Sequence, residues 1–77
     1  MIKYCELYLT TRKVLKGERN NITPRYEYSW HIFSREEGKF VELQSSYETT
    51  EDESEHTYPS REVAIQNGKE AIQDHYV

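Results

Sequence analysis

The chain has 77 residues, which is enough for one small domain, residues 1–77, and too few for two. It carries 10 Lys and Arg against 14 Asp and Glu, a net charge of −4, and no apolar run approaches the roughly 18 residues of a membrane-spanning helix. The single cysteine excludes an intramolecular disulfide, and the N-terminus lacks the apolar region of a secretory signal, so we expect a cytoplasmic protein without membrane contact. The content of aliphatic residues is low, so we expect the seven Tyr and one Trp to supply much of the apolar area of the core.

Residues 2–10 alternate in polarity and predict the first strand. Cys5 shares a face of that strand with Leu7 and Leu9, so we expect a buried, unreactive thiol. Residues 11–25 are polar, basic and interrupted by Gly and Pro, which predicts a flexible basic loop.

Residues 26–34 and 39–49 alternate as two further strands joined by a tight turn. A slip of one residue turns every side chain to the other face, so the apolar faces of the two strands coincide only in certain registers. We expect a four-residue loop, residues 35–38, with Gly38 at positive φ. That register pairs Ile32 with Val41, Trp30 with Leu43, Tyr26 with Tyr47 and Phe33 with Phe40.

Residues 48–57 contain five carboxylates and no apolar side chain, which predicts a solvated acidic loop. Ser60 is suited to cap a helix, Glu62 lies near its positive end, and an apolar stripe predicts a helix over residues 61–76. Gly68 within that stripe predicts a close approach of the helix to the sheet. The element order predicts an α+β domain, with a three-stranded antiparallel sheet and one C-terminal helix packed on one face.

The sequence contains none of the motifs that carry catalysis or cofactor binding. Its three histidines are widely spaced, its single cysteine belongs to no metal-binding motif, and its glycines form no phosphate loop. We therefore expect no enzyme, no catalytic residues, no metal site and no cofactor.

The leading functional prediction rests on the charge distribution, because residues 1–40 sum to +3 and residues 41–77 to −7. An acidic field steers association with basic surfaces. We expect a small protein-interaction module that docks on a larger basic protein, such as one that handles nucleic acid. The predicted contact residues are Glu42, Glu48, Glu51, Asp52, Glu53 and Glu55.

The alternative prediction is a nucleic-acid-binding sheet, because aromatic side chains flanked by Arg and Lys stack on bases. The predicted contact residues are Arg12, Lys13, Lys16, Arg19, Arg25, Tyr8 and Phe33. On the face away from the helix we expect five ring-bearing side chains, which also offer a homodimer interface. These are Tyr4, Tyr8, His31, Phe33 and Phe40.

A pattern of core and turn positions over residues 26–76 resembles small uncharacterised bacterial and phage proteins in which a hairpin precedes a Y-x-S-x-E-x-A helix start. It consists of Trp30-x-Ile32, Gly38, Val41, Ser46/Tyr47, Tyr58-x-Ser60-x-Glu62-x-Ala64 and Gly68-x-x-Ala71-Ile72. The layout also resembles three-strand-plus-helix DNA-binding domains of the integrase-arm and AP2 type, which implies base contacts from the exposed sheet face. Size and charge resemble phage inhibitors of the anti-CRISPR type, which implies an inhibitory role.

Overall fold

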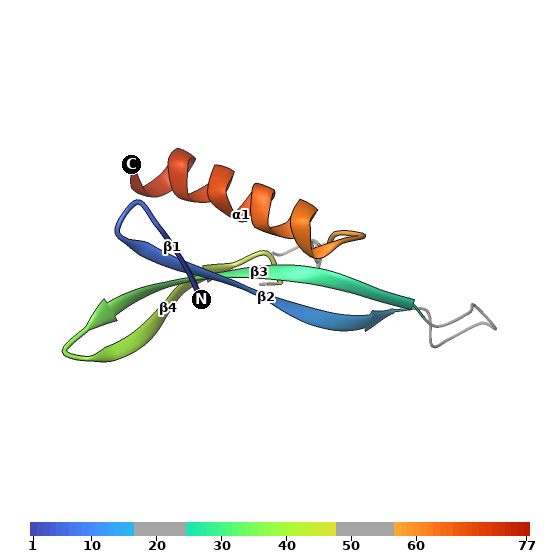
Figure 1. Ribbon diagram of the computed structural model, residues 1–77, viewed down its shortest axis with the longest axis horizontal. Coiled ribbons are helices and arrows are strands. Elements are labelled where there is room, and N and C mark those ends of the chain that lie inside the picture. Colours follow the sequence, from blue (N-terminus) through green and yellow to red (C-terminus); the bar gives the residue numbers. More distant parts are fainter. Residues whose placement is uncertain (17–24, 48–56) are drawn as a thin grey trace, which may run out of the picture.

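The computed structural model describes residues 1–16, 25–47 and 57–77, which form a four-stranded antiparallel sheet and one helix. The sheet order is β1-β2-β3-β4, and α1 lies along one face of it (Figure 1). The elements are β1 (Ile2–Tyr4), β2 (Leu7–Lys16), β3 (Arg25–Glu36), β4 (Lys39–Ser45) and α1 (Arg61–Tyr76). The α+β class and the C-terminal helix are confirmed, whereas the prediction of three strands is wrong.

The additional strand arises because the predicted strand over residues 2–10 is a tight hairpin. Cys5 and Glu6 have φ of 50° and 65°, and they reverse the chain so that Tyr4 pairs with Leu7. Neither turn residue is Gly or Asn, so the sequence carries no signal of a turn with positive φ at both positions. Cys5 is exposed at this turn, and the prediction of a buried thiol is wrong.

The prediction of a basic loop over residues 11–25 is wrong for residues 11–16 and for Arg25, which belong to strands. Strand β2 continues to Lys16, and β3 begins at Arg25. The two strands pair without interruption from Tyr8–Phe33 to Lys16–Arg25. Cross-strand hydrogen bonding and packing therefore override the low strand preference of this polar segment. Residues 17–24 lie outside the described residues.

The hairpin between β3 and β4 has a two-residue turn rather than the predicted four-residue loop. Glu37 and Gly38 have φ of 50° and 79°, so the positive φ predicted for Gly38 is confirmed. A turn of this kind matches the right-handed twist of the flanking strands, which favours it over a longer loop. As a result Val41 pairs with Ser34, two residues from the predicted partner Ile32.

A register shift between Ile32 and Phe33 alters the second half of β4. Phe33 pairs with Glu42 and Ile32 with Gln44, so Leu43 is the extra residue of a β-bulge. The predicted strand over residues 39–49 ends at Ser45. Beyond it, the Trp30 carbonyl accepts a hydrogen bond from the Ser46 N–H at 3.0 Å, and the Trp30 N–H donates to Ser46 Oγ at 3.0 Å.

The core lies between the sheet and α1. Burial of Trp30 and Ile32 is confirmed, whereas burial of Val41, Leu43 and Tyr47 is wrong because these side chains are 38–40% exposed. At Gly68 a Cβ atom would lie 2.5 Å from Leu9 Cδ1, so the predicted close approach of the helix is confirmed. The buried apolar side chains are Leu9, Trp30, Ile32, Ala64 and Ile72.

The start of α1 is fixed by a cap and by contacts with β3. The Val63 N–H donates to Ser60 Oγ at 3.2 Å, which confirms the predicted N-cap. Just before the cap, Tyr58 and Tyr28 exchange two backbone hydrogen bonds of 2.8 Å each. The guanidinium of Arg61 also lies 5.4 Å from the centre of the Tyr28 ring. These contacts anchor the helix start beside the first half of β3.

Candidate functional site

Three polar side chains form a hydrogen-bonded chain on the sheet face away from α1. Ser29 and His31 lie two residues apart on β3 and share this face, and Glu42 lies on β4. Ser29 Oγ is 2.8 Å from His31 Nε2, and His31 Nδ1 is 2.9 Å from Glu42 Oε1. Ser29 is fully buried and His31 is 4% exposed, whereas the Glu42 side chain is 43% exposed. This series of hydrogen bonds thus leads from the buried Ser29 on β3 to the exposed Glu42 on β4.

The order of these groups is that of a serine–histidine–acid triad, in which the imidazole takes the proton of the hydroxyl. A nucleophilic hydroxyl has to reach a substrate atom, however, and Ser29 has no exposed surface. In this conformation the three groups satisfy one another and join β4 to β3. His31, which we expected among the exposed rings of this face, is instead part of this buried chain.

The same face carries a cluster of rings and one arginine, which we call the open-face cluster: Tyr8, Phe33, Arg35 and Phe40. Tyr8 and Phe33 are cross-strand partners, and the Tyr8 and Phe40 rings meet edge to face with centres 5.1 Å apart. The Arg35 guanidinium lies 5.6 Å from the Phe40 ring centre, and Phe40 is 46% exposed. No described element lies along this face of the sheet in Figure 1.

The residues of the nucleic-acid prediction divide between the two faces. Because cross-strand partners share a face, Arg12 and Arg25 lie on the open face with Tyr8 and Phe33. Lys13 lies on the helix side, where its ammonium is 4.8 Å from the Tyr26 ring centre. The side chain of Lys16 and the whole of Arg19 lie outside the described residues.

Most of the predicted acidic contact residues lie outside the described residues. Glu42 is described, and it accepts a hydrogen bond from His31 or pairs with it when the imidazole is charged. The remaining predicted acidic contacts lie outside the described residues: Glu48, Glu51, Asp52, Glu53 and Glu55. Thr57, the last residue of the predicted acidic loop, donates a hydrogen bond from its hydroxyl to Glu27.

Strand β4 presents apolar side chains that the fold leaves uncovered. Val41 is 40% exposed and Leu43 is 38% exposed, and β4 is one of the two outer strands of the sheet. Among the described residues, no strand pairs with its outer edge. The alternation of the sequence predicts these residues as core and therefore does not identify them as surface residues. The signal that could have identified them is a two-residue turn at Glu37–Gly38, because that turn changes the register of β4.

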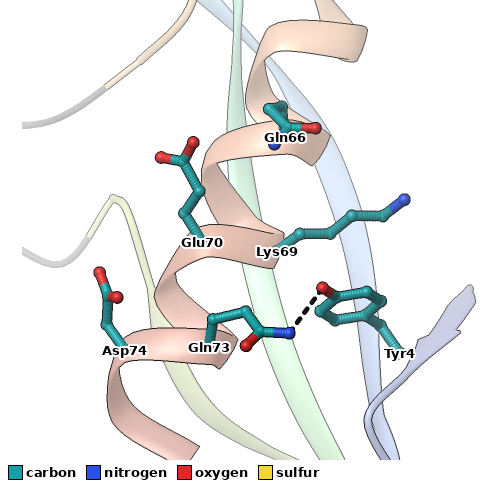
Figure 2. Close-up of a pocket in the computed structure, with 6 residues that line it drawn as sticks. All are labelled: Tyr4, Gln66, Lys69, Glu70, Gln73 and Asp74. Atoms are coloured by element: carbon teal, nitrogen blue, oxygen red, sulfur yellow. Dashed lines mark hydrogen bonds between the residues drawn. The ribbon is translucent and has the colours of Figure 1, made fainter. Parts of the chain in front are cut away.

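A shallow hollow lies between α1 and the first hairpin (Figure 2). Gln73 Nε2 donates to the Tyr4 hydroxyl at 2.8 Å, and the Lys69 ammonium lies 5.4 Å from the Tyr4 ring centre. In Figure 2, Glu70 and Asp74 point away from Tyr4. Tyr4 therefore belongs to the helix side, and its predicted place on the open face is wrong, because the turn at Cys5 restarts the alternation.

Over residues 1–16, 25–47 and 57–77, no group of three or more His, Cys, Asp or Glu side chains is arranged to hold a metal ion. In the same ranges no helix has the length and apolar character to cross a membrane. Comparison of the chain with protein-family models, with curated proteins and with solved structures gives no match. The resemblances drawn from the sequence stay predictions.

Proposed function

We propose that this chain is a non-enzymatic protein-interaction module that presents the outer strand β4 to a larger, basic partner. The observation that carries the proposal is the exposure of Val41 and Leu43 on β4, whose outer edge pairs with no strand in the described part of the chain. Protein edge strands are usually protected by charged side chains, proline or a covering element. Exposed apolar side chains on such an edge are typical of a surface that another chain covers.

The charge of the partner follows from the residues around and after this strand. In the sequence Glu42 lies between Val41 and Leu43, with its side chain 43% exposed, and residues 48–55 add five carboxylates shortly afterwards. Apolar contacts would provide affinity, and the carboxylates would provide steering and selectivity for Lys and Arg. A basic partner that handles nucleic acid fits this chemistry, and occupation of its nucleic-acid site would make the chain an inhibitor of phage or bacterial origin.

A cytoplasmic location belongs to the same proposal. The thiol of Cys5 is free and exposed. Such a thiol persists unpaired in a reducing compartment and tends to form intermolecular disulfides in an oxidising one.

The first test is affinity capture with the tagged chain and two matched variants, Val41→Asp and Val63→Asp. Both valines are 40% exposed, but Val63 lies on α1. We expect Val41→Asp to weaken capture of the partner by about tenfold or more, because a charge would replace a central apolar contact. Val63→Asp should capture the partner as the wild type does. Equal effects of the two substitutions, with both variants folded by circular dichroism, would refute the assignment to β4.

A second test addresses the carboxylates that follow β4. Replacement of Glu51, Asp52, Glu53 and Glu55 by Ser should slow association with the captured partner, most strongly at low salt. Charge steering acts over about 10 Å at 0.1 M ionic strength, so the difference should shrink as salt rises. Stopped-flow association rates over a salt series measure it. An unchanged rate and salt dependence would remove these carboxylates from the interface.

A further inference from the structure

The open-face cluster and the charges around it form a second surface, on the sheet face opposite the one that Val41 shares with Ser34. Phe40 is the most exposed ring of the cluster, and the Arg35 guanidinium lies against it at 5.6 Å. Tyr8 and Phe33 extend the cluster across β2 and β3, in register with each other. The result is a row of flat side chains over three neighbouring strands, on a face along which no described helix or strand packs (Figure 1).

The charged side chains of this face favour an anionic ligand. Arg12 and Arg35 are exposed, on β2 and β3. Both carboxylates that face this side from β3 and β4 have partners: Glu27 with Arg25 at 3.0 Å, and Glu42 with His31 at 2.9 Å. Arg25 offsets the charge of Glu27, and the Glu42 carboxylate is hydrogen-bonded to the His31 imidazole, while Arg12 and Arg35 are exposed on the same face. The local charge is positive although the chain as a whole carries −4.

We infer that the open face binds single-stranded nucleic acid, with bases stacked on Phe40 and Arg35 and a phosphate held by Arg12. Aromatic rings and guanidinium planes stack on any base, and exposed arginines neutralise the phosphates between bases. In a duplex the bases are already stacked and their faces are inaccessible, so a sheet of this kind selects single strands. The net negative charge disfavours general attraction to nucleic acid, and stacking then has to provide most of the affinity.

The experiment is fluorescence anisotropy of labelled 12-mers of oligo(dT) and oligo(U) with the full chain, and of a 12-base-pair duplex for comparison. Arg12→Gln and Lys13→Gln are the matched pair, because they remove the same charge from neighbouring residues on opposite faces of β2. Phe40→Ala removes the most exposed ring. Val41→Asp tests independence from the proposed protein interface, because Val41 pairs with Ser34 on the helix side of β3.

We expect both single strands to bind more tightly than the duplex at low salt. Phe40→Ala should weaken binding by about tenfold, a typical loss for one stacked base. Arg12→Gln should weaken binding and reduce the salt slope by about 1, whereas Lys13→Gln and Val41→Asp should bind as the wild type does.

Three results would overturn the inference. The first is an absence of oligonucleotide binding in 20 mM salt. If the chain instead captures a protein, and this capture depends on Phe40, the face belongs to a protein partner. The second is an equal loss in Arg12→Gln and Lys13→Gln, which would indicate charge attraction without a defined face. The third is duplex binding as tight as that of the single strands. None of these results bears on the proposed contact through Val41 and Leu43, which the Val41 and Val63 variants test separately.

Discussion

Trp30→Ala is expected to lower the free energy of unfolding by about 3–5 kcal/mol, the usual loss when a large aromatic side chain is removed from a core. Trp30 is 7% exposed and packs with Leu9, Ile32 and Ile72, which are all fully buried. A core with so few members cannot compensate for the cavity, and small domains have little stability in reserve. We therefore expect the variant to be largely unfolded at room temperature.

Urea denaturation followed by far-ultraviolet circular dichroism measures this loss. Tyr26→Ala is the control on the same face of the same strand, where a ring that is 57% exposed should contribute less than about 1 kcal/mol. Trp30→Phe should cost less than Trp30→Ala. It keeps an aromatic ring and removes the indole Nε1, a buried donor without a hydrogen-bond partner in the described part of the chain. A native-like midpoint for Trp30→Ala would show that the core has been placed wrongly.

His31→Ala is expected to cost about 2–4 kcal/mol, because it leaves a buried hydroxyl without its main partner and removes a packed ring. Ser29 Oγ would then depend on the Arg12 carbonyl, which lies 3.5 Å away. Glu42 is 43% exposed and can be hydrated, so it should contribute little to the loss. His75→Ala, at an exposed position near the end of α1, should change stability by less than about 0.5 kcal/mol.

A double-mutant cycle separates the hydrogen-bonded chain from simple packing. Ser29→Ala alone should cost about 1–2 kcal/mol, because it leaves His31 Nε2 unpaired. The variant with both substitutions should cost about 1 kcal/mol less than the two single losses together, since neither partner is then left alone. Additive losses would mean that Ser29 and His31 contribute independently, and that their 2.8 Å contact adds nothing to stability.

Local patterns in the sequence predicted much of the fold. The helix, its Ser60 cap, the close approach at Gly68 and the burial of Trp30 and Ile32 follow from periodicity and residue type, and the structure has them as expected. These features depend on neighbouring residues or on one face of one element, and a single sequence carries that information well.

The errors arose where two segments had to be aligned with each other. The turn at Cys5–Glu6 contains neither Gly nor Asn, so nothing local marked the reversal of the chain. In the second hairpin, a two-residue turn and a bulge together moved Val41 and Leu43 away from the core positions that alternation predicted. A bulge changes the register of a strand without a recognisable sequence signal.

The candidate surfaces were predictable only in part, for the same reason. Ser29 and His31 lie two residues apart on one strand, so their shared face could be read from the sequence. Their link to Glu42 requires the register of β4, which the sequence did not determine. Exposure of Val41 and Leu43 likewise appeared only once that register was known.

The register of β3 and β4 is therefore the observation on which the proposed interface depends. Cross-strand nuclear Overhauser effects between backbone protons measure it directly. We expect contacts between Phe33 and Glu42 and between Ser34 and Val41. Contacts between Phe33 and Phe40 and between Ile32 and Val41 would contradict the account, because that register would return Val41 and Leu43 to the core and leave no apolar surface on β4 for a partner.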